Sequence, residues 1–314
     1  MTELAAPRGY YQYPVVKRPV WTWEVPAYFW LGGMAGGAYV TASLAQAFGS
    51  EDVRRRGADG FYIAAAALLP CAPLLILDLG RPERFHHMLR IFKPLSPMNL
   101  GAWALTAFSP VAVARAAAQA GDDGLLPAPV RMLARLLPKR IVEAGGSLLG
   151  LTLAGYTGVL LAATNVPVWA KSKLLGGLFT ASAMSSGSAA VTLIASRRRA
   201  CDDTIHRLAA IESAASLGEL ALLSGYLAQS GKTAAPLVSE RLAGPFWFGA
   251  VGMGAILPLL LHRLARPRHG KALRSLSTVA VVCSIMGSLA LRWTIFEAGK
   301  VSAQDQTASL EFSR

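Results

Sequence analysis

The chain has 314 residues, of which 53% are hydrophobic and 16% are charged, and its formal net charge is +13. A soluble domain usually carries about a quarter charged residues, so this composition, with a mean hydropathy of +0.40, argues against a soluble domain. The positive charge does not indicate a nucleic-acid-binding protein, because no nucleic-acid-binding motif accompanies it in the sequence.

Apolar residues form repeated stretches of about twenty residues, the length that crosses about 30 Å of hydrocarbon as a helix. Eight such stretches are predicted, in chain order: Val25–Phe48, Gly60–Leu79, Met98–Ala118, Val142–Thr164, Leu174–Ser196, Leu208–Gln229, Gly244–Leu264 and Leu276–Ala298. No strand signal, long soluble insertion or low-complexity linker interrupts them. The predicted fold is therefore all-α, a polytopic membrane protein with about eight transmembrane helices in two four-helix bundles.

The sequence divides into three expected parts. Residues 1–20 are polar and contain proline, so they do not resemble a cleavable signal peptide. We expect the transmembrane domain at residues 21–305, with one half at about 21–165 and the other at about 170–300, and a C-terminal tail at 306–314.

Lysine and arginine are unevenly distributed between the two predicted faces. The connections after spans one, three, five and seven hold 17 of these residues, and the opposite face holds 13. The positive-inside rule places the richer face in the cytoplasm and both termini on the other side of the inner (plasma) membrane. Residues Pro129–Arg140 support this orientation, because their apolar and basic positions match an amphipathic segment lying on anionic lipid.

Cysteine and histidine usage predicts which redox groups this protein does not hold. Cys71, Cys201 and Cys283 are scattered without a Cys-x-x-Cys pair, whereas an iron–sulfur cluster needs about four cysteine thiolates. The five histidines fall in connections or at helix ends, whereas a b-type haem needs facing histidines inside the bundle. The sequence thus predicts no haem, no iron–sulfur cluster and no metal site.

Two carboxylates lie at the ends of predicted spans. Glu24 begins the first span and Asp78 ends the second, and ionisable groups at membrane depth are interpreted as functional by default. Two plainer interpretations stay open. Asp78 could be a helix-terminal carboxylate paired with Arg81 or Arg84, and Glu24 could belong to an interfacial belt of aromatic residues.

Three further ionisable residues lie within the second half. Glu212 and Glu219 are seven residues apart and share one face of the sixth span, and Arg292 lies in the eighth. We expect Arg292 to pair with Glu212 or Glu219 as a buried structural bridge rather than to serve transport. The glycine pairs at 32–33, 36–37 and 145–146 are expected to be helix-packing surfaces. They do not indicate a nucleotide site, because no strand precedes them.

The order of motifs resembles the NrfD-like family, the membrane subunits of polysulfide reductases. Four segments resemble, in turn, that family's first span, second connection, fourth span and C-terminal end: Trp23–Gly37, Asp78–Phe85 continuing to Trp103, Tyr156–Leu161, and Arg292 with Ala298–Lys300. The resemblance runs from Tyr10 to about Asp305, and the Asp-Leu-Gly-Arg-Pro connection is its most specific part.

The resemblance implies an anchor without haem or cluster that exchanges electrons with quinone, such as menaquinone. Such subunits sit against a ferredoxin-like iron–sulfur subunit, which joins them to a catalytic subunit, often a molybdopterin enzyme; some relatives have multihaem cytochrome partners. The connection Gly80–Pro97 on the non-cytoplasmic face is the docking candidate, because it mixes basic and aromatic residues. An interfacial loop without a partner can have the same composition.

The resemblance also implies a headgroup pocket in the first half (about 21–165), near the non-cytoplasmic face. It implies Tyr156 as a hydrogen-bond partner, Glu24 or Tyr28 opposite it, and Asp78 as a proton relay, since quinone chemistry moves protons. Tyr28 stands where some relatives carry a histidine. The other predicted binding residues are Trp23, Arg81 and His86, with His87 as a secondary candidate.

Two functions of other classes stay open. Secondary transporters also combine small-residue helices with buried carboxylates, but the candidate interior helix breakers, Pro70, Pro73 and Pro258, form no clear pair in corresponding halves at mid-membrane depth. Alternatively, the protein could be a structural anchor for a complex that binds quinone elsewhere.

Overall fold

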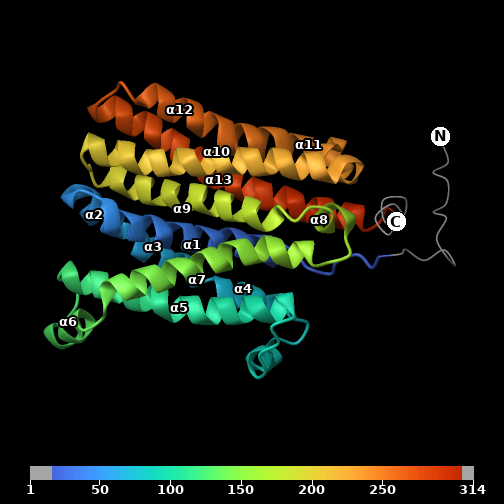
Figure 1. Ribbon diagram of the computed structural model, residues 1–314, viewed down its shortest axis with the longest axis horizontal. Helices are drawn as coiled ribbons and strands as arrows, with labels where there is room; N and C mark the ends of the chain where they lie inside the picture. The colour runs from blue at the N-terminus through green and yellow to red at the C-terminus, as the bar shows by residue number, and fades with distance from the viewer. Residues whose placement is uncertain (1–15, 306–314) are drawn as a thin grey trace.

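The computed structural model describes residues 16–305, whose regular secondary structure is all helical, with no strand in that range (Figure 1). Residues 1–15 of the predicted N-terminal segment 1–20, and the whole predicted tail 306–314, lie outside the described part. The helices are α1 Glu24–Phe48, α2 Glu51–Gly57, α3 Asp59–Leu68, α4 Cys71–Leu77, η2 Pro82–Leu89, α5 Pro97–Asp122, α6 Ala128–Arg135, α7 Lys139–Ala162, α8 Pro167–Ala170, α9 Leu175–Arg197, α10 Asp202–Ser230, η3 Gly231–Val238, α11 Glu240–Gly244, η4 Pro245–Ile256, α12 Leu257–Ala265 and α13 Gly270–Ser302.

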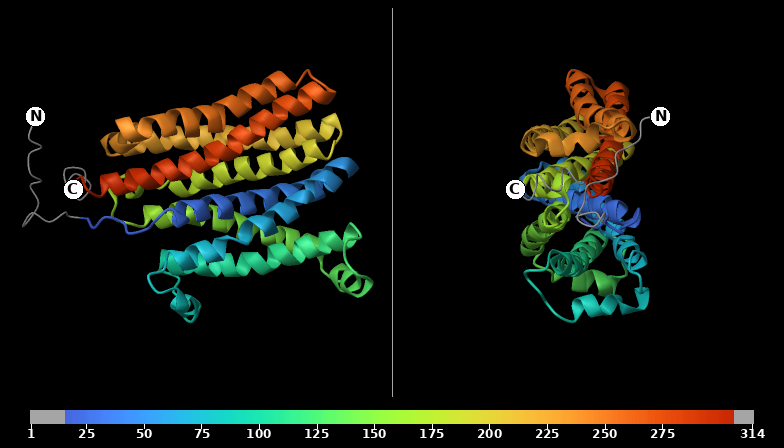
Figure 2. Two further views of the ribbon diagram at one scale, coloured as in Figure 1. Left: turned by 180° about the vertical axis from the view of Figure 1, so that it is seen from behind. Right: turned by 90° about the vertical axis from the view of Figure 1, so that its right-hand side faces the viewer.

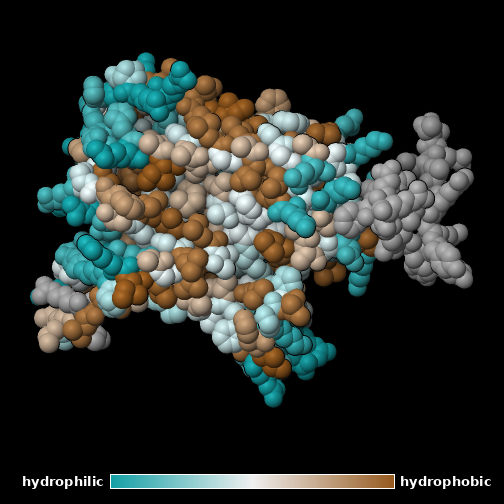
Figure 3. All heavy atoms as spheres, in the orientation of Figure 1, coloured by the Kyte–Doolittle hydropathy of each residue, from teal (hydrophilic) through white to brown (hydrophobic). Residues whose placement is uncertain are grey.

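Seven helical stretches in the described range are long and apolar enough to cross a membrane, close to the predicted eight. They are Glu51–Leu77, Pro97–Asp122, Lys139–Ala162, Leu175–Arg197, Asp202–Val238, Glu240–Ala265 and Gly270–Ser302. The predicted span that is absent from this set is α1, which has 25 residues and includes two glycine pairs and two tyrosines. These residues lower its hydropathy, and α1 tolerates them because most of its residues are buried against other helices. Figure 3 shows one face of the molecule, with hydrophilic residues at both ends of the long axis and apolar residues between them.

The long helices lie side by side, with those of the first half on one side and those of the second half on the other (Figures 1 and 2). Between them, α1 and α9 meet along a seam of small residues. A Cβ atom added at Gly37 would collide with the backbone oxygen of Ala183, and one at Gly187 would collide with the backbone of α1. The expected glycine packing is confirmed at Gly37 and also at Gly36 and Gly146, whereas a side chain at Gly145 would meet open space.

The second span is interrupted at Pro70. Helix α3 ends at Leu68 and α4 begins at Cys71, because proline lacks the N–H that would continue the hydrogen-bonded ladder. Helix α4 then carries Asp78 at its C-terminal end. The chain turns there into η2, which lies outside the bundle at the end where α1 begins and α13 ends.

Arg292 is fully buried, but the expected direct ion pair with Glu212 or Glu219 is not formed. No carboxylate among the described residues lies within 4.0 Å of its guanidinium. The guanidinium instead donates to the Ser182 and Ser288 hydroxyls, at 3.0 and 2.6 Å, and to the Phe179 carbonyl at 2.9 Å. Glu219 lies beyond these hydrogen-bonded groups. It interacts with Arg292 electrostatically, and both residues interact with the Ser182 hydroxyl.

Glu212 faces a different helix. Its carboxylate lies 3.0 Å from the ring of His262 on α12, and both side chains are buried. Glu212 and Glu219 share a face of α10 but lie about 10 Å apart along its axis, so Glu212 meets α12 at the level of His262, whereas Glu219 is the carboxylate that interacts with Arg292 on α13. The expectation that Glu212 pairs with Arg292 is wrong for this reason.

Candidate functional site

A cavity of about 350 Å³ lies in the first half, at the end of the bundle where α1 begins. Its walls come from the segment before α1, from α1, α4, η2 and α5, and from α7. Ligand sites in proteins have volumes of about 300–1,000 Å³ and are mostly apolar with a few placed polar groups. The cavity therefore has the size and composition of a site for a small apolar ring compound.

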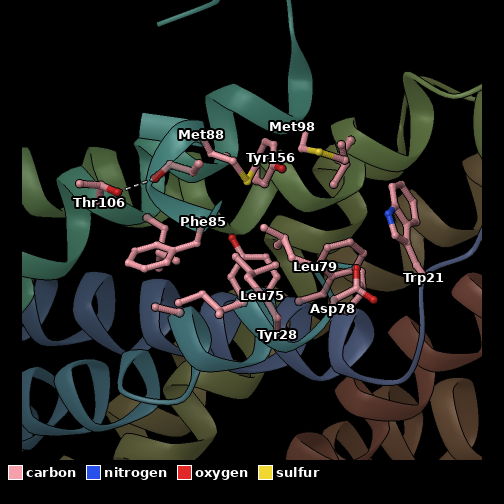
Figure 4. A pocket seen from close by; sticks show the side chains of 18 of the residues that line it. Trp21, Tyr28, Leu75, Asp78, Leu79, Phe85, Met88, Met98, Thr106 and Tyr156 are labelled. Atoms are coloured by element: carbon pink, nitrogen blue, oxygen red, sulfur yellow. Dashed lines mark hydrogen bonds between the residues drawn. The ribbon is translucent and has the colours of Figure 1, made fainter. Parts of the chain in front are cut away.

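The apolar wall is built from elements that lie far apart in the sequence. Trp21 precedes α1, Leu75 belongs to α4, Phe85 and Met88 belong to η2, and Met98 begins α5. Figure 4 shows these side chains gathered around one space, with η2 folded over it. Because η2 is amphipathic and short, it covers the cavity with Phe85, Met88 and Leu89, while the rest of its residues stay exposed.

Two tyrosines reach the cavity from different helices. The side chain of Tyr28, on α1, is 1% exposed, and its hydroxyl has no hydrogen-bond partner among the described residues. A buried hydroxyl without a partner is costly, so its position in a cavity favours a ligand as the missing partner. Tyr156, on α7, lies near it in the same cavity (Figure 4). The Tyr156 ring packs against Gly101 of α5, where any Cβ would collide with it.

Two carboxylates meet through one threonine beside the cavity. The backbone N–H and the hydroxyl of Thr22 each lie 3.2 Å from Oδ1 of Asp78. The same hydroxyl contacts the Glu24 carboxylate. Asp78 forms no ion pair with Arg81 or with other residues in the described range, so the interpretation of Asp78 as half of an interfacial ion pair finds no support.

The sequence matches a family model described as "Polysulphide reductase, NrfD" over residues 13–303, nearly its whole length. The protein belongs to this family. Among its NrfD-family relatives, the C chain of polysulfide reductase from Wolinella succinogenes is 30% identical over 90% of the present sequence and 94% of its own length. Protein NrfD of Escherichia coli is 28% identical over 90% of the present sequence and 96% of its own length. These matches confirm the resemblance that the motifs indicated.

The structure brings together some of the residues that the NrfD motifs suggested. Tyr28, Tyr156 and Asp78 line the cavity, and Glu24 is connected to it through Thr22. The other three predicted binding residues lie outside the lining: Trp23, which is 56% exposed, and the exposed Arg81 and His86.

Several lining residues were not predicted. Trp21, Phe85 and Met98 form much of the wall, and Thr106 lies on α5 with its hydroxyl bonded to the Ala102 carbonyl at 2.8 Å. Phe85 and Met98 belong to the NrfD-like second connection that follows the Asp-Leu-Gly-Arg-Pro motif, so this segment was a signal for them. Thr106 lies in no motif, and only the packing of α5 places it here.

The C-terminal NrfD motif, Ala298–Lys300, has a packing role against Trp169 of α8. Trp169 is fully buried between the halves, stacks on Phe296 at 6.0 Å, and donates from Nε1 to the Ile295 carbonyl at 2.7 Å. Its indole occupies the space that a side chain at Gly299 would need. The Ala-Gly-Lys segment at the C-terminal end therefore holds α13 against the connection that follows α7.

Proposed function

We propose that this NrfD-family protein is the quinone-binding membrane subunit of a respiratory oxidoreductase, with the headgroup held in the cavity of Tyr28 and Tyr156. The single observation that carries the proposal is the buried hydroxyl of Tyr28, which has no hydrogen-bond partner within residues 16–305 and lies at an apolar cavity of about 350 Å³. A quinone ring is flat and apolar with two carbonyl oxygens, so it needs an apolar wall and hydrogen-bond donors. One relative is named as the C chain of polysulfide reductase, which supports a role as one subunit of a larger enzyme.

The residues divide the chemistry between binding and proton transfer. A quinone takes up two electrons and two protons on reduction and releases them on oxidation. The hydroxyls of Tyr28 and Tyr156 donate to its oxygens. Asp78 lines the cavity and shares Thr22 with Glu24. A proton can therefore pass between Asp78 and Glu24 through the threonine hydroxyl, which both donates and accepts.

The electrons come from or go to a partner, which we place on η2. The exposed side of this segment and of the loop after it carries Phe92, Ile91, Arg84 and Arg90. The opposite side of η2 is the cavity wall. A helix with its side chains is about 10–12 Å across, so an iron–sulfur subunit seated here lies about one helix diameter from the quinone. The exposed aromatic and basic residues suit a protein interface.

The test is a purified complex in native lipids, assayed for quinol oxidation and for bound headgroup density. The variant Tyr156→Phe keeps the ring that packs on Gly101 and removes only the hydroxyl. We expect lower quinone affinity, with the partner still co-purifying. Unchanged quinone affinity in this variant, or a quinone found outside the cavity, would leave the protein as a structural anchor. Purification without any redox partner would instead favour a transporter.

A further inference from the structure

A second cavity lies at the opposite end of the bundle, between α1, α2, α5 and α7, with a volume of about 930 Å³. We call it the basic cavity, because five of its lining residues are cationic: Arg54, Arg55, Arg115, Lys139 and Arg140. None of the site residues predicted from the sequence lines the basic cavity. It also shares no lining residue with the cavity of Tyr28 and Tyr156, in which we propose that quinone binds.

Only part of this positive charge is neutralised within the protein. Two carboxylates line the basic cavity, and each already has a cationic partner. Arg115 Nη2 lies 2.8 Å from Glu143 Oε1, and Lys139 Nζ lies 2.6 Å from Asp122 Oδ2. Among the described residues that line the cavity, five cations and two carboxylates leave an excess of three positive charges.

The excess belongs to three exposed arginines, Arg54, Arg55 and Arg140, which have no ion pair in the described part of the chain. Like charges around one space repel one another, and an anion between them removes that repulsion. Guanidinium groups bind phosphate through two parallel hydrogen bonds. The three exposed arginines, which form the mouth of the basic cavity, thus favour a phosphate group as the bound anion.

The remaining wall mixes polar side chains such as Ser43 and Gln119 with an apolar part, and the apolar part is not explained by a phosphate ion alone. Leu44 and Val40 on α1 and Leu151 on α7 line the cavity away from the arginines. Along α7 the lining extends from Lys139 to Leu151, a rise of about 18 Å at 1.5 Å per residue. A phosphate ion would leave this wall bare, whereas a phospholipid covers it with its acyl chains.

We propose that the basic cavity binds one anionic phospholipid, with its phosphate on Arg54, Arg55 and Arg140 and its acyl chains along Leu44 and Leu151. Basic pockets between transmembrane helices bind anionic headgroups in this way. The neighbouring helix α6 suits the same level of the bilayer, because Met132 in it, like Leu136 after it, is exposed, at 73% and 74%. This site does not depend on quinone binding at the other end.

The experiment is native mass spectrometry of the full-length protein, purified in detergent and titrated with phosphatidylglycerol or phosphatidylcholine. The variant Arg54→Gln/Arg140→Gln removes two charges from the mouth. Each cation near a lipid phosphate contributes about 1 kcal/mol, so we expect about a 30-fold loss of phosphatidylglycerol affinity. The control Arg263→Gln/Arg266→Gln removes two exposed charges at the end of α12 that do not line the cavity, and it should keep the affinity of the original protein.

Three results would overturn the proposal. Equal binding of the two lipids by the original protein would show that the negative charge is not recognised. An equal loss in the α12 control would show a general effect of net charge. Inorganic phosphate that displaces the lipid at equal concentration would identify a phosphate site instead. The comparison of the two lipids on the original protein stands even if the double variant does not fold.

Discussion

Replacing Tyr28 with phenylalanine should act in opposite directions on the empty protein and on its affinity for quinone. The Tyr28 hydroxyl is buried without a partner among the described residues, a state that costs about 1–3 kcal/mol. Phenylalanine keeps the ring, so the free energy of unfolding of the quinone-free protein should rise by up to about that amount. The same variant loses one hydrogen bond to bound quinone, worth about 0.5–1.5 kcal/mol, so quinone affinity should fall about 2- to 10-fold.

The assay is thermal unfolding in nanodiscs, with and without added quinone, together with a quinone titration. Tyr39→Phe is the matched control, because Tyr39 is also fully buried in the first half but donates to the Val142 carbonyl at 2.9 Å. It should lose about 1 kcal/mol of stability and keep its quinone affinity. If Tyr28→Phe instead destabilises the empty protein as Tyr39→Phe does, the Tyr28 hydroxyl has a structural partner and the argument for the quinone site fails.

Three other substitutions test separate features. Asp78→Asn should lower quinol turnover by about 10²–10⁴-fold, measured in the purified complex, because it removes the proposed proton relay. Gly101→Val inserts a side chain against the Tyr156 ring and should cost about 1–3 kcal/mol of stability in a denaturant titration and weaken quinone binding. His262→Ala leaves the buried Glu212 carboxylate without its partner and should cost about 3–5 kcal/mol in the same titration. The first has a refuting outcome, and the other two have matched control variants. Full turnover in Asp78→Asn would remove this carboxylate from the mechanism. Gly145→Val places the same side chain in open space and should leave stability and quinone binding unchanged. The double variant Glu212→Leu/His262→Leu removes both polar groups and should recover most of the stability lost in His262→Ala. A double variant as unstable as the single one would refute the pairing as the cause.

The sequence predicted the long helices well because membrane spans depend on local hydropathy and length. It also indicated Tyr28, Tyr156 and Asp78, which lie in motifs and meet in one cavity. The sequence did not predict that Thr22 joins Asp78 to Glu24, because this contact depends on how the segment before α1 passes the end of α4. Contacts of this kind arise from tertiary packing, which hydropathy does not describe.

The surroundings of Arg292 could not be predicted for a related reason. Shared membership of a helical face showed that Glu212 and Glu219 point in similar directions, but not which neighbouring helix each one meets. The different depths of the two carboxylates along α10 place Glu212 beside His262, while serine hydroxyls and a carbonyl make the direct hydrogen bonds to Arg292. Neutral hydrogen-bond acceptors can thus hold a buried arginine while the nearest carboxylate lies further away. A prediction that only pairs opposite charges cannot find this arrangement.

The seam between α1 and α9 limits how the two halves can move. Where Gly37 meets Ala183 and Gly187 meets Ala38, backbone lies against backbone with no layer of side chains between them. Alternating-access carriers work by rocking one half of the fold against the other, and such rocking here would separate atoms in direct contact along the seam. We therefore expect the two halves to move as one rigid frame, and a covalent cross-link between α1 and α9 to leave the proposed quinone turnover unchanged.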